Sequence, residues 1–276
     1  FLHLNSTPYY TSKVHHKKIF IFIFLYNNIF NITEVLHNQK KKKGLLISNN
    51  AFISTKFVES FNRIAVKIEH QKSRDGSKVF AITSFAENEG KSTVSSNLAL
   101  SLARKGNKVL LMDMDGKKPA IYKLFGCSYV EYAELGALFN GEISRKDYKL
   151  RRYKKTKLYL AINTRAYANS YKWIETGMAK KTIKALKGMV DYIIIDTAPI
   201  SVDSSVSEII KMADKTVLVV KTDIVESSTI NDAILTITEV GDNLAGCILN
   251  GTHPDVFMAS FTGAGDEGKY SRGKYY

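Results

Sequence analysis

The sequence is short of cysteine and of acidic residues, and it has no long hydrophobic run. Its two cysteines, Cys127 and Cys247, lie far apart and show no metal-ligand spacing. This excludes a disulfide scaffold and a cysteine-rich zinc site, and it is typical of a reducing cytosol. There are 26 acidic against 40 basic residues, so the formal net charge is +14. Such an excess suits nucleic acid, an anionic membrane or an acidic partner, and charge alone does not choose among them.

The most apolar stretch covers residues 19–26. It is too short to cross a bilayer alone, because a span needs about 20 largely apolar residues. No small-residue cleavage site follows it, which argues against a secretory signal. Lysines come next at 40–43, and they suit either a juxtamembrane anchor or a solvated linker. We therefore expect residues 1–43 to be a basic, apolar leader that is poorly defined.

Helix-like and strand-like segments alternate between residues 44 and 250. The helical patterns cover 55–70, 92–104, 172–189, 204–212 and 227–240, and the short apolar runs cover 79–83, 109–112, 158–162, 192–195, 216–220 and 247–249. Apolar runs without polar alternation are typical of strands buried on both faces. We therefore predict a single α/β domain over 44–250, with helices on both faces of a mainly parallel sheet. The glycine-rich segment 251–276 predicts a flexible tail.

Residues 79–93 read VFAITSFAENEGKST, a strand, a polar loop and a helix start, which is the context of a phosphate-binding loop. Backbone N–H groups at the helix start would hold phosphate oxygens, Lys91 would reach the terminal phosphates, and the Ser92 hydroxyl would ligate Mg²⁺. Phe85 stands where the general Walker A pattern has its first glycine, so the match is not strict. The alternative is a helix that merely begins with these residues. We assign ATP binding to Glu87, Asn88, Glu89, Gly90, Lys91, Ser92 and Thr93.

Two further predicted strands end in aspartates. Asp113 and Asp115 follow the run at 109–112, and Asp196 follows the run at 192–195. Ligands of open α/β sheets sit beyond the carboxyl ends of the strands, so these side chains should face the phosphate loop. One such aspartate alone is more often a loop cap than a ligand, but together with the GKST sequence the three favour a catalytic site. We expect Ser92, Asp113 and Asp196 to hold Mg²⁺, and Lys91, Asp113 and Asp115 to be catalytic; the spacing does not decide which aspartate is the base.

From about residue 50 to 250 the sequence resembles the bacterial protein-tyrosine kinases of capsule and exopolysaccharide systems (BY-kinases), which are P-loop proteins of the deviant Walker type. The last predicted strand, at 247–249, is followed by an asparagine, as in the wider superfamily. The other matching features are FNGEIS at 139–144, the acidic motif of Asp113, Asp115, Lys117 and Pro119, and the terminal tyrosines Tyr270, Tyr275 and Tyr276.

This resemblance implies Mg·ATP-dependent autophosphorylation of Tyr270, Tyr275 and Tyr276, in which the tail of one subunit enters a neighbour's site within a ring. It places Asn250 near the nucleotide base. It further implies a transmembrane adaptor of the polysaccharide co-polymerase type as activator, a cognate tyrosine phosphatase, and a position at the cytoplasmic face of the plasma membrane. No nucleic-acid partner is expected.

The sequence departs from the family pattern at several positions. Glu87-Asn88 replaces a usual Pro-Gly pair, Lys117 replaces a usual arginine, and the helix at 55–70 keeps Glu59 with only one arginine, Arg63. A loop before the third helix retains only Asn169-Ser170 of its usual Gly and Asn-Pro pattern. Ring assembly is therefore less strongly implied than ATP binding.

Two other functions stay open from the residues. A positioning ATPase of the Min or Par type shares the predicted fold, but it would carry a signature lysine where this chain has Ala86, and it lacks a terminal tyrosine cluster. A catalytically weakened or inactive paralogue would serve as a scaffold for the membrane adaptor. The intact Lys91, Asp113, Asp115 and Asp196 count against that scaffold.

Overall fold

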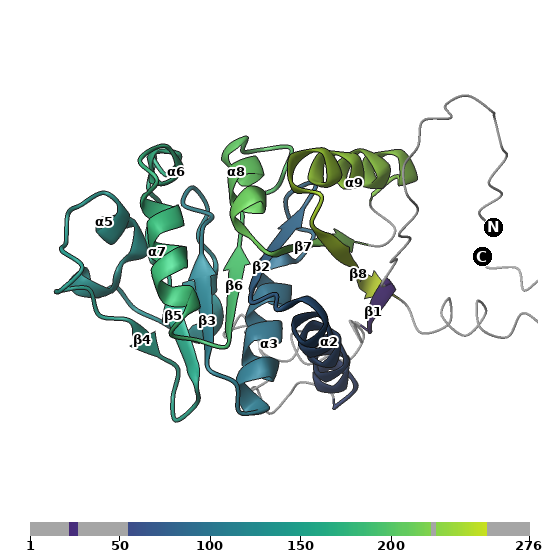
Figure 1. Cartoon of the computed structure of the whole chain (residues 1–276), viewed down its shortest axis with the longest axis horizontal. Helices are drawn as coiled ribbons and strands as arrows, with labels where there is room; N and C mark the ends of the chain where they lie inside the picture. Colours follow the sequence, from purple (N-terminus) through teal and green to yellow (C-terminus); the bar gives the residue numbers. More distant parts are fainter. Residues whose placement is uncertain (1–21, 27–54, 222–224, 253–276) are drawn as a thin grey trace, which may run out of the picture.

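The computed structural model describes residues 22–26, 55–221 and 225–252, and a mixed but mainly parallel sheet organises them (Figure 1). Within these ranges the sheet has eight strands in the order β1-β8-β7-β2-β6-β3-β5-β4. All neighbouring strands pair in parallel except β4 with β5. The strands are β1 (Phe22–Tyr26), β2 (Val79–Ser84), β3 (Val109–Asp113), β4 (Arg151–Arg152), β5 (Leu158–Ala161), β6 (Tyr192–Asp196), β7 (Lys215–Lys221) and β8 (Leu244–Thr252).

Helices cover both faces of this sheet, as the sequence predicts. They are α2 (Thr55–Asp75), α3 (Lys91–Arg104), α4 (Ile121–Phe125), α5 (Leu135–Phe139), α6 (Lys172–Glu175), α7 (Met178–Lys187), α8 (Ser205–Met212) and α9 (Ser227–Gly241), with a 3₁₀ turn at Glu131–Ala133. Helices α2 and α3 pack with Phe80 and Ile82 of β2, whereas α5, α6 and α7 pack with Val79 and Ala81 on the other face. Successive residues of a strand point to opposite faces, so a strand with both faces covered must be apolar throughout. The predicted α/β architecture is confirmed.

The region predicted as one helix over 172–189 is two helices. Helix α6 ends at Glu175 and α7 begins at Met178, because Gly177 between them adopts a left-handed φ of 67°. Such a φ suits glycine and interrupts the helical hydrogen bonds. The break lets α6 turn its Trp173 into the core, where the indole N–H donates to Asn140 Oδ1 at 2.9 Å.

Part of the predicted leader belongs to the sheet. Residues Phe22–Tyr26 form the edge strand β1, which pairs in parallel with β8. The other leader residues, and Tyr270, Tyr275 and Tyr276, lie outside the described residues. No helix in the described ranges is long and apolar enough to span a membrane.

Candidate active site

The phosphate loop joins the end of β2 to the start of α3 at the carboxyl edge of the sheet. Two loop residues have positive φ angles, Asn88 at 62° and Gly90 at 96°. Asparagine tolerates this region better than most side chains, so Asn88 can stand where the family pattern has glycine. Gly90 is the N-cap of α3 and supplies no capping side chain. The first-turn N–H groups of a helix have no intrahelical acceptor, so those of α3 suit phosphate oxygens.

Glu89 fixes the loop from inside. Its side chain is buried, and Oε1 accepts a hydrogen bond from the Ala86 N–H at 2.6 Å. The other oxygen, Oε2, accepts from the Lys221 N–H at the end of β7 at 3.2 Å. The carboxylate that the sequence assigns to ATP binding is therefore directed toward the protein backbone, where it ties the loop to a neighbouring strand.

Asn250, near the end of β8, lies against the same loop. Its Nδ2 donates to the Glu89 carbonyl at 2.9 Å. A Cβ atom added at Gly90 would lie 2.1 Å from Asn250 Nδ2, which is far inside van der Waals contact. Glycine is thus required at position 90 both by the φ angle and by the neighbouring amide. The structure brings Asn250 to the loop backbone, next to the place that the sequence assigns to the nucleotide.

Lys91 and Ser92 open α3 beside the aspartates. The Lys91 side chain is buried although it is a cation, and its charge acts on Glu87 and Asp196. A buried lysine needs anionic partners, since desolvation penalises an isolated charge. Thr93 follows in the same turn and is half-buried. The sequence-predicted cation, hydroxyl and acids are therefore together at one edge of the sheet.

The aspartates meet because β3 and β6 are neighbours in register. Asp113 and Asp196 are paired positions on these strands, and the Met114 N–H donates to the Asp196 carbonyl at 2.8 Å. Asp113 Oδ1 accepts from the Asp115 N–H at 3.2 Å. Among the described residues, Asp113 Oδ2 and both carboxylate oxygens of Asp196 are buried without a hydrogen bond of normal geometry. Buried oxygens of this kind need a ligand or a proton.

Burial dominates the electrostatics of these acids. It raises the pKa of Asp113 well above its usual range, and the neighbouring Asp196 and Asp115 raise it further. Burial also raises the pKa of Asp196 to about 6, against the lowering effects of Lys91 and the Ser92 hydroxyl. A bound cation would reverse this pattern, because a nearby positive charge favours the ionised carboxylates.

The residues present suit a divalent cation that is completed by other oxygens. In the described part of the chain, no three His, Cys, Asp or Glu side chains form a ready metal cluster. Mg²⁺ usually takes one or two carboxylates together with water and substrate phosphates. The unsatisfied oxygens of Asp113 and Asp196 beside the Ser92 hydroxyl fit that donor set.

Two lysines after the acidic pair form contacts that sequence reasoning did not identify. Lys118 Nζ contacts both carboxylate oxygens of Glu87, at 2.6 and 2.8 Å, and this hydrogen bond is the chief cause that lowers the pKa of Glu87. Lys117 Nζ lies 2.9 Å from Asp203 Oδ2, in the loop before α8. Asp203 belongs to no motif, so only the fold reveals this partner. Both pairs connect the segment after β3 with other loops at the same edge.

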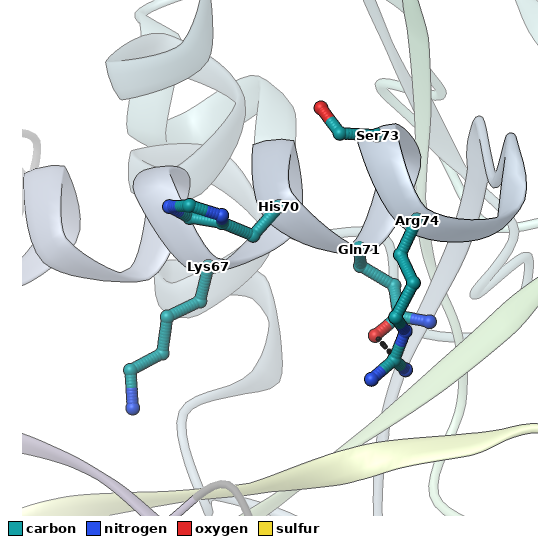
Figure 2. A pocket seen from close by; sticks show the side chains of 5 residues that line it. All are labelled: Lys67, His70, Gln71, Ser73 and Arg74. Carbon is teal, nitrogen blue, oxygen red and sulfur yellow. Dashed lines mark hydrogen bonds between the residues drawn. The ribbon is translucent and has the colours of Figure 1, made fainter.

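A separate hollow of about 540 Å³ lies along α2, away from the phosphate loop. Figure 2 shows its lining, in which the Arg74 guanidinium donates to Gln71 Oε1 at 2.9 Å. Closer to the amino-terminal end of α2, Glu59 and Arg63, which the sequence links to oligomer formation, form an exposed ion pair at 3.7 Å. Ion pairs of this exposed type contribute little stability. The hollow contains none of the predicted site residues; it is lined by Lys67, His70, Gln71, Ser73 and Arg74.

Comparisons with known proteins agree with this geometry. A family model described as an AAA domain matches residues 77–248. The tyrosine-protein kinase CpsD of Streptococcus agalactiae is 31% identical over 214 residues, which cover 78% of this chain and 91% of CpsD.

Solved structures share the fold. The kinase domain of the Escherichia coli tyrosine kinase ETK superposes with a TM-score of 0.69 at 19% identity, covering 87% of this chain and 91% of that domain. The septum site-determining protein MinD of Pyrococcus horikoshii, solved with Mg-ADP, gives 0.55 at 22% identity, covering 66% and 76% respectively. At these identities the likeness concerns the fold alone, so the sequence relative and the family model decide the membership. The chain belongs to the bacterial tyrosine kinases of the P-loop nucleotide-binding superfamily.

Proposed function

We propose that this chain transfers a phosphoryl group from Mg·ATP to tyrosine hydroxyls, in capsular or exopolysaccharide biosynthesis. The observation that carries the proposal is the group of buried, unsatisfied oxygens on Asp113 and Asp196 beside Lys91 and Ser92. A site of this composition is built for polyphosphate charge together with a divalent cation. The polysaccharide context comes from the family resemblance.

Each residue has a defined task in this proposal. Lys91 and the N–H groups that open α3 stabilise negative charge on the phosphates, while Ser92, Asp113 and Asp196 hold the metal. When bound, Mg²⁺ would supply further charge neutralisation on the phosphate oxygens. Asp115 is the better candidate for accepting the tyrosine proton, because 8% of it is exposed whereas Asp113 is fully buried. The acceptor hydroxyl must arrive from solvent.

The tail tyrosines Tyr270, Tyr275 and Tyr276 are the proposed acceptors. Asn250 near the end of β8 contacts the phosphate loop, so the chain leaves the sheet at the edge that carries the site. From Thr252 to Tyr270 there are 18 residues, and an extended chain of that length reaches about 60 Å. That reach suits transfer to a neighbouring subunit, and tethering raises the local concentration of the acceptors.

The family resemblance supports the proposed partners. They are a transmembrane adaptor of the polysaccharide co-polymerase type, further copies of this chain in a ring, and a cognate tyrosine phosphatase. Such an adaptor would hold the kinase at the cytoplasmic face of the plasma membrane.

A Min or Par type ATPase is the alternative to test. MinD shares the fold, but position 86 here is an alanine whose N–H holds Glu89, and it offers no cation to a phosphate. The inactive scaffold is the other alternative, and the complete set of lysine, hydroxyl and acids argues against it.

The test is incubation of the full chain with labelled ATP and Mg²⁺, with and without the adaptor's cytoplasmic segment. We expect phosphotyrosine in the wild type and in Lys123→Met, a control at an exposed lysine of α4. Lys91→Met and the triple variant Tyr270→Phe, Tyr275→Phe, Tyr276→Phe should lose it. ATP hydrolysis without phosphotyrosine in the presence of adaptor would favour the positioning ATPase, and neither activity would favour the scaffold.

A further inference from the structure

The amino-terminal end of the sheet, opposite the phosphate loop, carries a row of lysines. Backbone hydrogen bonds link the residues that precede adjacent strands: Ile193 N–H to the Lys78 carbonyl at 2.8 Å, Asp191 N–H to the Lys108 carbonyl at 2.7 Å, and Val109 N–H to the Lys157 carbonyl at 3.0 Å. Neighbouring strands are about 4.8 Å apart, so Lys78, Asp191, Lys108 and Lys157 follow one another along a single edge, in the strand order β2-β6-β3-β5.

The turn between β4 and β5 extends this row with Lys154 and Lys155, which are both exposed. In Figure 1 this turn lies toward the bottom of the view, at the start of β5. We call Lys78, Lys108, Lys154, Lys155 and Lys157 the basic edge. Lys154, Lys155 and Lys157 are close in sequence, and the fold adds Lys78 and Lys108 from the starts of β2 and β3.

The acidic residues near the basic edge are already paired with other lysines. Asp75 lies 3.3 Å from Lys215, and Asp191 lies 3.8 Å from Lys72. By contrast, no member of the basic edge has an ion pair with a carboxylate anywhere in the described residues. Two carboxylates also lie at this end: Asp191 Oδ2 accepts from the Lys108 N–H at 2.7 Å, and Asp214 Oδ2 accepts from the Lys78 N–H at 2.8 Å. The five lysines outnumber these two acids, so the edge keeps an excess of positive charge.

A large apolar side chain lies at the same end. Met189 is 61% exposed and sits in the short connection between α7 and the start of β6. An exposed methionine costs free energy in water and adds nothing to the binding of a phosphate chain, whereas it gains by entering a lipid interface. Lys108 and Lys154 also lie over the rings of Tyr159 and Tyr153, at 5.7 and 5.2 Å. Lysines without an ion pair, next to an exposed apolar side chain, favour a lipid surface over nucleic acid.

We propose that the basic edge, together with Met189, binds an anionic lipid leaflet directly. The lysines contact the headgroups, each raising affinity a few-fold, and Met189 inserts at the interface. Since the phosphate loop is at the opposite end of the strands, a chain bound in this way keeps its nucleotide site directed away from the bilayer. This contact is independent of the proposed kinase activity and of any adaptor.

The test is co-sedimentation of the full chain with phosphatidylcholine vesicles that contain or lack phosphatidylserine. The reversal Lys154→Glu, Lys155→Glu, Lys157→Glu should weaken binding to the anionic vesicles by roughly tenfold or more. The matched control is Lys172→Glu, Lys180→Glu, Lys181→Glu, on exposed lysines of α6 and the first turns of α7. It makes the same change in net charge, and we expect a loss below about threefold because exposed charges are screened within about 8 Å.

Met189→Ser tests the apolar part without changing any charge. It should weaken vesicle binding several-fold and leave the salt dependence of the remaining binding unchanged. All variants should bind a fluorescent ADP analogue like the wild type, which checks folding and separates this inference from the kinase proposal. Unchanged vesicle binding in the basic-edge reversal would assign binding to other lysines and overturn the inference. Equal binding to neutral vesicles, or binding to duplex DNA but not to vesicles, would overturn it as well.

Discussion

Asp113 and Asp196 are held without solvent and without enough hydrogen-bond donors. Their burial raises the pKa of both carboxyl groups, that of Asp196 to about 6. A folded protein whose carboxyl pKa lies above the unfolded value binds more protons than the unfolded chain between the two values. Its stability is therefore highest below the unfolded pKa and falls as the pH rises through the folded one. Without a ligand, the buried carboxylates of the nucleotide site therefore lower the stability of the folded protein near neutral pH.

This pKa shift gives a pH prediction for the metal-free protein. Between about pH 4 and pH 7, Asp196 should lower the free energy of unfolding by roughly 2 kcal/mol, and Asp113 should act in the same direction. In Asp196→Asn the free energy of unfolding should decrease less over the same pH range, since the amide does not ionise. Urea unfolding in EDTA at several pH values measures this, and an identical pH dependence in the two proteins would contradict it.

Gly90 gives a prediction with a matched control, because Gly106 has the same φ of 96°. Gly90→Ala adds both backbone strain and a clash with Asn250, whereas the Cβ of Gly106→Ala meets no atom within 4 Å in the described part of the chain. Strain of this kind costs about 1–3 kcal/mol. We expect Gly106→Ala to lose only this amount of stability, and Gly90→Ala to lose more and to bind nucleotide weakly.

Combining Gly90→Ala with Asn250→Ala should restore part of the lost stability, since the clashing amide is removed. Thermal unfolding of the three variants checks this order. Equal destabilisation by the two single glycine substitutions would show that the contact with Asn250 is not limiting.

At the level of elements, the phosphate loop depends on neighbours that are distant in sequence. Glu89 ties it to the end of β7, Asn250 of β8 packs on it, and Lys118 holds Glu87 from the segment after β3. The sequence predicts the loop and both acidic strand ends, because apolar runs and the polar or glycine residues that bound them are local signals. It does not predict the Lys117 contact with Asp203, since such partners depend on which strands become neighbours.

The difference between local signals and contacts set by the fold also explains which elements the sequence does not predict. The region from 120 to 152 has only short elements, such as the five-residue α4 and α5 and the two-residue β4, so no period can build up. One glycine is compatible with a helical pattern, so the sequence does not reveal the break at Gly177. An isolated apolar run does not reveal its pairing with β8, so the sequence alone places β1 in a leader.

Replacing Glu89 should separate loop positioning from surface charge. Glu89→Ala leaves the N–H groups of Ala86 and Lys221 without their acceptor, so we expect a loss of about 2 kcal/mol in stability and weaker ADP binding. Glu87→Ala is the control, because it removes the exposed pair with Lys118 and should change stability little. Unfolding curves measure both variants, and ADP titration measures Glu89→Ala. A comparable loss of stability at the two positions would contradict a special role for Glu89.

At the level of the whole molecule, the proposed site and the proposed acceptors belong to different parts of the chain. The proposed site is formed by β2, β3, β6 and α3, whereas the tyrosines follow β8 in the sequence. The residues between β8 and the tyrosines are numerous enough to reach the site of another copy. Transfer between copies therefore has a direct test. Lys91→Met, which keeps its tyrosines, is mixed with the tyrosine-to-phenylalanine triple variant, which keeps its site. Phosphate should appear on the Lys91→Met chain, and its absence in the mixture at high concentration with adaptor present would indicate transfer within one chain.

The most direct measurement of the central claim is the affinity for ADP as a function of Mg²⁺ concentration, because the account requires the phosphate loop and the two buried strand-end acids to form one site. The wild type should bind ADP more tightly as Mg²⁺ is added. Asp196→Asn should lose this Mg²⁺-dependent gain by at least about tenfold while it retains the fold. Binding that is independent of Mg²⁺, or a gain that is equal in Asp196→Asn and the wild type, would contradict the claim that these residues form a metal-nucleotide site.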